Sequence, residues 1–326
     1  MRPLVSLVEV RPETIEADYR RALALAGLDR APAAGPWTVA AGLDGARWQA
    51  GRTCPPWQVG AALQAAAAGS GTAAVGVAAV GPGGLQAWPT AAPWGGLAGG
   101  APVKDAAAAR GEPVPFRSRA RLASLEATGA EPKVPFALRH QPVLALAAAD
   151  LVSPWRLEGA CATLGRLILA GHPSRRGVPG AEVQAETVAV LRELFPAMGA
   201  VIDGTVWHVG PGGRTLARHV VLAGDDPVAV DAIALRLAGY RPREVSWLRL
   251  CAERELGAVE PEQMRLVGHT ALLDLDFALP EPTFARAAFP GFLGRLMSGR
   301  SNRPAGSPPG GPWGALYADL AAADRG

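Results

Sequence analysis

Asp203 and a glycine-rich segment that follows it form the first group of residues with potential chemistry. Asp203 ends a short apolar run, where open α/β sheets place their ligands. The glycine-rich segment is Gly210, Pro211, Gly212 and Gly213, and Arg214 and Arg218 follow it. Backbone N–H groups of such a loop can approach an anion, and the two arginines can balance its charge. We expect a phosphate or carboxylate site with these six residues binding the ligand; a simple hairpin turn is the alternative.

Asp226 and Asp231 form the second group. Asp226 precedes Pro227, which is typical of a helix N-cap, while Asp231 lies one turn further among apolar residues. A buried carboxylate must be paired or must bind something, so Asp231 is a candidate for catalysis together with Asp203. If Asp203, Asp226 and Asp231 converge, their oxygens could hold Mg²⁺ or another hard cation. The alternative for Asp226 is a capping role alone.

Two of the five histidines flank the glycine-rich segment. His208 and His219 could meet across a hairpin as a metal-binding or acid–base pair, and we include His208 among the catalytic candidates. Structural roles for both are the alternative. No Ser-His-Asp or Cys-His motif and no nucleotide-binding fingerprint is present.

Alternating strand and helix patterns must position these residues. Strands are expected at residues 4–10, 37–41, 73–80, 134–138, 142–147, 200–202, 206–209 and 219–223. Helices are expected at residues 12–27, 57–68, 159–170, 182–195 and 227–239. The order predicts an α/β fold with a layered, mostly parallel or mixed sheet flanked by helices.

The same pattern divides the chain into two similar α/β halves and an extension. Residues 1–130 form the first half and include an irregular excursion at 86–115; residues 131–270 form the second. Residues 271–326 contain a flexible linker and a short terminal helix from Trp313 to Ala323. We expect this extension to dock on its own domain or on a protein partner.

Bulk composition excludes several classes of protein. The 326 residues are 49% hydrophobic and 19% charged, as in globular proteins. The net charge of +3 and the absence of a basic cluster argue against nucleic-acid binding. Three well-separated cysteines give no local iron–sulfur or zinc motif and no disulfide scaffold, so the cofactor stays unknown. No signal peptide or transmembrane segment is expected, which favours the cytoplasm.

The segment from Asp226 to Ala232, after a strand and after Asp203-Gly204 with its Gly-Pro loop, resembles the signature of the domain-of-unknown-function 362 family (DUF362). The order of elements over residues 4–268 is similar to that family's layout. The resemblance implies an α/β protein that handles an anionic small molecule or a metal, in redox or cofactor metabolism. Family members carry lysines in three places where this chain has the segments Ala41–Asp44, Trp155–Leu157 and Ala162–Arg166, and some carry a ferredoxin-like cysteine cluster that is absent here.

Three function classes follow. The first is an enzyme or cofactor-handling protein that acts on an anionic small molecule near Asp203, His208 and Asp231. The second is a catalytically degenerate binding or assembly subunit, which the missing family lysines favour. The third is a plain ligand-binding module that uses the glycine loop for phosphate.

Overall fold

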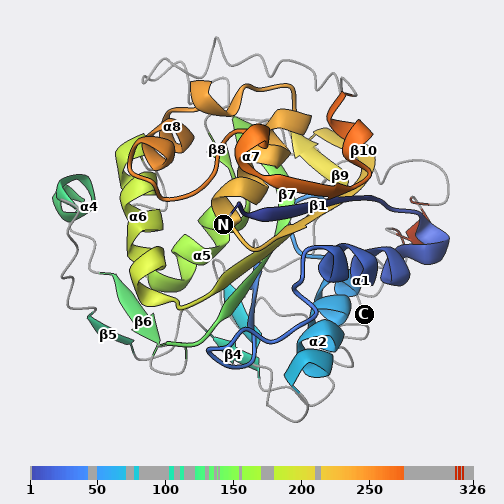
Figure 1. Cartoon of the computed structure of the whole chain (residues 1–326), viewed down its shortest axis with the longest axis horizontal. Helices are drawn as coiled ribbons and strands as arrows, with labels where there is room; N and C mark the ends of the chain where they lie inside the picture. The colour runs from blue at the N-terminus through green and yellow to red at the C-terminus, as the bar shows by residue number, and fades with distance from the viewer. Residues whose placement is uncertain are drawn as a thin grey trace.

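A mixed β-sheet with helices on both faces forms the body of the protein (Figure 1). The computed structural model describes residues 2–42, 50–70, 77–80, 103–105, 111–113, 122–128, 132–135, 138, 140–153, 156–169, 180–209, 214–274, 313, 315, 316 and 318. Within these residues nine strands join one sheet. The predicted α/β fold with a layered mixed sheet is confirmed.

The strands of the main sheet are β1 (Leu4–Glu9), β2 (Thr38–Gly42), β3 (Val77–Val80), β4 (Val103–Asp105), β7 (Val143–Ser153), β8 (Arg156–Leu157), β9 (Met198–Val209), β10 (Arg214–Gly224) and β11 (Arg265–Gly268). Two further strands, β5 (Gly111–Pro113) and β6 (Lys133–Pro135), pair with each other. The α-helices are α1 (Ile15–Leu25), α2 (Pro56–Ser70), α4 (Ala123–Ala127), α5 (Ala160–Ile168), α6 (Ala181–Leu194), α7 (Pro227–Leu237) and α8 (Ser246–Glu253). Short 3-10 helices are η1 (Pro12–Thr14), η5 (Pro242–Glu244), η6 (Pro261–Gln263) and η7 (Thr270–Asp274).

The strand order is β11-β1-β10-β9-β7-β2-β3-β4, with β8 beside β7. Pairs along this path are parallel except those of β10, which runs antiparallel to both β1 and β9. Consequently β1, β2, β7 and β9 all end at the same edge of the sheet. Parallel sheets bind ligands at this edge, because the connections after the strand ends leave crevices there.

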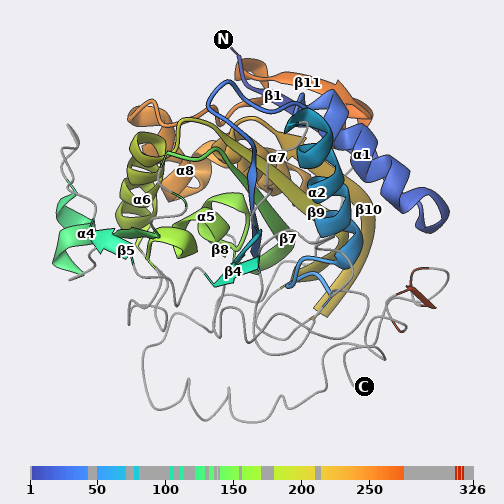
Figure 2. The same cartoon turned by 90° about the horizontal axis from the view of Figure 1, so that it is seen from below.

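Two apolar cores lie on opposite faces of the sheet. Helices α1 and α2 cover one face, and their core includes Tyr19 and Trp57. Helices α5, α6, α7 and α8 cover the other face, and their core includes Trp207 and Trp247. Figure 2 shows α1 and α2 together on one side of the sheet and α5, α6 and α8 on the other. Because side chains alternate along a strand, β1, β2, β7, β9 and β10 each contribute to both cores.

Helix α7 begins and ends as its sequence predicts. The Asp226 side chain accepts a hydrogen bond from the backbone N–H of Val228 at 2.9 Å, and Pro227 occupies the first helical position. Gly239 follows the helix with φ +89°, a backbone conformation that L side chains rarely adopt. The predicted capping of this helix is confirmed.

Asp231 joins α7 to α5. It is completely buried, and its two oxygens accept hydrogen bonds from the backbone N–H groups of Ala160 at 2.7 Å and Cys161 at 2.9 Å. These N–H groups belong to the first turn of α5, where they have no partner within the helix. A Cβ on Gly159 would lie 2.2 Å from Asp231 Oδ1, so the approach of the two helices requires glycine there. The expectation that this buried carboxylate must be paired is confirmed.

Several predicted elements differ from the structure. Residues 200–202 and 206–209 belong to a single strand, β9, and the strand predicted at 219–223 extends back to Arg214. Strands β4 and β5 fall inside the predicted excursion at 86–115, most of which lies outside the described residues. The predicted division into halves stays a prediction, although strands from both stretches share one sheet.

The described part of the C-terminal extension contains one buried residue, Trp313. Its ring stacks on His219 with 5.2 Å between centroids, and it packs in the core beside α1 and α2. Residues 313, 315, 316 and 318 are helical, within the predicted terminal helix. None of the helices built from described residues has the length and apolar character needed to cross a membrane.

We expect Asp231→Ala to lower the free energy of unfolding by about 2–4 kcal/mol, because two buried N–H groups lose their acceptor and a cavity remains. Asp225→Ala is the matched control. Asp225 is exposed and accepts one hydrogen bond, from Leu4 N–H, so its loss should cost about 1 kcal/mol or less. Urea unfolding at pH 7 measures both. Equal effects would contradict the proposed tie between the helices.

Candidate functional site

An irregularity in β9 determines which side chains meet at the ligand-binding edge of the sheet. Oδ1 of Asp203 accepts hydrogen bonds from the backbone N–H of Thr205 at 2.7 Å and from its hydroxyl at 2.6 Å. Along the neighbouring strand β7, Ala148 pairs with Asp203, but Asp150 pairs with His208. The additional residues of β9 form a bulge, a feature that re-aims side chains near functional sites. Asp203 therefore lies inside the strand, and the prediction that it ends a strand is wrong.

His208, Asp150 and Arg52 form a connected polar group at this edge. His208 Nδ1 lies 2.7 Å from Asp150 Oδ1, and Arg52 Nε lies 3.2 Å from Asp150 Oδ2. The Asp150 side chain is 3% exposed, that of His208 is 11% exposed and that of Arg52 is 33% exposed. A buried carboxylate thus orients an imidazole near the surface, and a cation lies beside them.

Gly51 holds this group together through the backbone. Its φ is +73°, and a Cβ added there would lie 2.6 Å from the His208 backbone nitrogen. The turn that carries Arg52 therefore rests directly on the bulge that carries His208. Glycine is required at this position for its conformation and for the close contact.

Asp203 lies beneath the His208–Asp150 pair. Asp203 pairs with Ala148 of β7, which precedes Asp150 by two residues. Two residues span about 7 Å along a strand, and their side chains lie on the same face of the sheet. Burial raises the pKa of Asp203 to about 6, and hydrogen bonds from Thr205, Tyr19 and Trp57 partly offset the rise. Two of these donors come from α1 and α2, so the carboxylate is part of the core beneath the site.

Cys54 is also buried close to this layer, and its Sγ donates a hydrogen bond to the backbone oxygen of Leu146 at 3.0 Å. Burial raises the pKa of its thiol to about 12. Because the thiolate is the reactive form of cysteine, Cys54 is a packing residue and not a nucleophile at neutral pH.

The three predicted metal ligands have separate partners. Asp203 binds Thr205, Asp231 binds the start of α5, and Asp226 caps α7 while it lies 2.5 Å from Arg192 Nη2. Burial is the main cause that raises the pKa of Asp231 to about 6, with a smaller contribution from the negative charge of Asp226. Among the described residues no group of three or more His, Cys, Asp or Glu side chains could hold a metal ion. The predicted three-carboxylate cation site does not form in this part of the chain.

The predicted anion loop is described only at its ends. Gly210, Pro211, Gly212 and Gly213 lie outside the described residues. Strands β9 and β10 pair up to Val209 and Arg214, as the hairpin alternative expects. Arg218 is half-buried, and its Nη1 donates a hydrogen bond to the backbone oxygen of Ala217.

His219 does not meet His208 across the hairpin. The residue opposite His208 is Thr215, and His219 lies within a register shift of β10 with φ +55°. Burial lowers the pKa of His219, which stacks on Trp313. The hypothesis of a histidine pair is therefore wrong, and Asp150 is the partner of His208 instead.

Sequence reasoning missed Asp150, Arg52 and Gly51 as site residues. Asp150 directly follows the apolar residues at the start of β7. A polar residue at the end of such a buried run is the sequence signal that could have identified it. Arg52 is separated from it by 98 residues and belongs to no local motif. The contact that unites them depends on strand order and on the bulge, and neither leaves a signal in sequence spacing.

Comparison with known proteins adds no further constraint: no family model, curated protein or solved structure matches the chain significantly.

We expect Gly51→Ala to disturb the site, because the new Cβ would collide with the backbone at His208. The free energy of unfolding should fall by at least about 1 kcal/mol, and the NMR signals of the His208 ring should shift. Gly35→Ala is the control, since Gly35 also has a positive φ but a Cβ there meets nothing within 4 Å. Unshifted His208 signals in Gly51→Ala would contradict the close contact.

Asp203 should make stability depend on pH. Its pKa in the folded protein is about 6, above the ordinary value of 3.8, so the folded state binds a proton more tightly than the unfolded state between these values. Stability is therefore present at low pH and is lost as pH rises from about 4 to 6, by about 2–3 kcal/mol. Asp203→Asn should flatten this part of the profile.

Urea unfolding at half-unit steps from pH 4 to pH 7.5 measures the effect. Asp274→Asn, at an exposed position, is the control and should keep the wild-type slope. Asp231 titrates in the same range in all three proteins and leaves a common background. The same slope in Asp203→Asn and wild type would show that Asp203 is not the titrating group.

Proposed function

We propose that the protein is an enzyme that moves a proton on a small anionic molecule at the edge of the sheet formed by the ends of β7 and β9. The observation that carries this proposal is the 2.7 Å contact between His208 Nδ1 and the buried Asp150 carboxylate. An ionised carboxylate that accepts a hydrogen bond from Nδ1–H leaves the Nε2 lone pair for chemistry. Among the described residues Nε2 has no hydrogen-bond partner.

His208 would act as the general base and then as the general acid. Nε2 takes a proton from the bound molecule, and the Asp150 carboxylate stabilises the imidazolium that forms. Nε2 then returns the proton to another atom of the same molecule or to its leaving group. Histidine suits this role because its ordinary pKa lies near neutral pH.

Arg52 supports an anionic substrate. Its Nε lies 3.2 Å from Asp150 Oδ2, and its side chain is 33% exposed. A guanidinium can bind a carboxylate or phosphate through two parallel hydrogen bonds. In this arrangement the substrate anion lies next to Arg52, and the atom that loses a proton faces His208.

The donor set favours a small anion over a metal ion as the ligand. The group of His208, Asp150 and Arg52 offers one imidazole and one carboxylate, and Arg52 already occupies an oxygen of that carboxylate. Stable cation sites in proteins use more oxygen or nitrogen ligands than these.

Membership of DUF362 remains a proposal that rests on the Asp226–Ala232 signature. In the structure Asp226 and Asp231 of this segment accept hydrogen bonds from backbone N–H groups, so we propose a structural role for these two signature residues. We also propose the cytoplasm as the location. Three buried, unpaired cysteines agree with a reducing compartment.

A thermal-shift screen of small phosphorylated and carboxylated molecules, followed by activity assays on each binder, tests the function. We expect a binder to raise the Tm of wild type and of His208→Gln, while Arg52→Gln weakens binding by about tenfold or more. Turnover should fall by about 10²–10⁴-fold in His208→Gln. His140→Gln, at an exposed histidine, is the matched control and should keep full activity.

The outcomes separate the function classes. Binding that depends on Arg52 without turnover of any binder would contradict the enzyme and favour a plain ligand-binding module. No binder at all, together with a stable protein partner in native mass spectrometry, would favour the degenerate assembly subunit.

A further inference from the structure

A polar hollow lies at the same edge of the sheet, beyond β10 from His208. Its volume is about 290 Å³, and it is lined by Glu9, Arg11, Thr14, Asp18, Arg21 and His269. Strands β1 and β11 are parallel and both end here, so the hollow occupies a ligand-binding position of a parallel sheet. Strands β1 and β9 are separated by one strand, or about 10 Å, so the hollow is distinct from the His208 group.

The ring of His269 is held in one orientation. Its backbone N–H donates to the Leu7 oxygen at 2.7 Å, and its Nδ1 accepts a hydrogen bond from the Glu9 backbone N–H at 3.0 Å. Because Nδ1 is the acceptor, the proton of the neutral ring is on Nε2. The hollow therefore receives an N–H donor even when His269 carries no charge.

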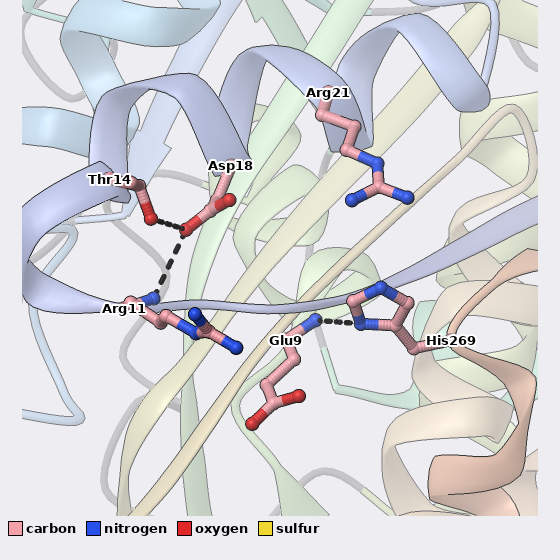
Figure 3. Close-up of a pocket in the computed structure, with 6 residues that line it drawn as sticks. All are labelled: Glu9, Arg11, Thr14, Asp18, Arg21 and His269. Carbon is pink, nitrogen blue, oxygen red and sulfur yellow. Dashed lines mark hydrogen bonds between the residues drawn. The ribbon is translucent and has the colours of Figure 1, made fainter.

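Arg11 and Arg21 are the two cations among the residues that line the hollow, and in Figure 3 the Arg11 guanidinium lies on the side of Glu9. Among the described residues neither guanidinium forms an ion pair, whereas Arg52, Arg166, Arg192, Arg241, Arg243 and Arg249 each lie against a carboxylate. Figure 3 shows the Arg21 guanidinium extending from α1 toward β1, with the outer nitrogen of His269 on the ring edge nearer to Arg21.

Among the described residues, the two carboxylates of the hollow form no ion pair with Arg21 or His269. Oδ2 of Asp18 accepts hydrogen bonds from the Arg11 backbone N–H at 3.1 Å and the Thr14 hydroxyl at 2.7 Å, so it is engaged in the turn before α1. In Figure 3 the Glu9 carboxylate points away from Arg21. The hollow therefore offers Arg21 and His269 Nε2–H to an anion.

We propose that this hollow binds the phosphate group of a small molecule, with Arg21 and His269 Nε2–H as its donors and Arg11 as a further cation. Phosphate fits better than a carboxylate because its oxygens can accept from Arg21, His269 and Arg11 separately, whereas a carboxylate has only two oxygens for these three groups. This site is independent of the proposed enzyme at His208. It gives the edge of the sheet two anion sites, one on each side of β10.

Titration with inorganic phosphate at constant ionic strength and pH 7.5, followed by calorimetry, tests the site. We expect saturable binding by the full chain and a Kd at least about tenfold higher in Arg21→Ala and in His269→Ala. Arg20→Ala is the matched control: it removes the same charge from the same helix, but Arg20 bonds to Glu16 and does not line the hollow. Its Kd should stay within about twofold of wild type.

A second control separates the two anion sites. Arg52→Gln alters the His208 group and should leave phosphate binding at the hollow unchanged. The proposal is overturned if wild type shows no saturable phosphate binding, if Arg20→Ala weakens binding as much as Arg21→Ala, or if only Arg52→Gln abolishes it. The last result would assign the phosphate to the His208 group and would leave the enzyme proposal intact.

Discussion

The hydrogen bonds between Asp203 and Thr205 shape the edge of the sheet on which the candidate site depends. They turn the Asp203 carboxylate back onto its own strand, and β9 bulges before it resumes its pairing with β7. Without the additional residues of this bulge, His208 would lie beyond the level of Asp150. The pairing of an imidazole with a buried carboxylate is thus a consequence of strand register, and the turn at Gly51 fixes the same register from the α2 side.

The other buried carboxylates connect helices to one another. Asp231 accepts hydrogen bonds from backbone N–H groups in the first turn of α5. Asp226 does the same for the first turn of α7, and it also accepts a hydrogen bond from the Ala258 N–H at 3.2 Å. Unpaired N–H groups at buried helix starts cost free energy, and a carboxylate is a strong acceptor for them. Two acidic residues that resemble a metal motif in the sequence therefore serve the packing of one face of the sheet.

Local chemistry was readable from the sequence, and long-range contacts were not. Asp226, Pro227 and Gly239 predict the limits of α7 because capping depends on neighbouring residues. The buried state of Asp231 was predictable from its apolar neighbours, but its partners lie 70 residues away in α5. His208 was recognised as a candidate, yet Asp150 and Arg52 join it only through the order of β2, β7 and β9. The predicted end of the strand at Asp203 failed because a bulge and a strand end share the same Asp-Gly signal.

The antiparallel strand β10 between β1 and β9 has a consequence for how the chain is made. Strand β1 precedes every other strand of the sheet along the chain, but its neighbours in the sheet are β10 and β11. The bond from Leu4 N–H to Asp225 closes a loop of 221 residues. The backbone N–H and C=O groups along both edges of β1 stay unpaired until β10 and β11 have been made, and contacts of such long range slow folding. The architecture that places two ligand positions side by side thus leaves β1 waiting for strands that lie some two hundred residues further along the chain.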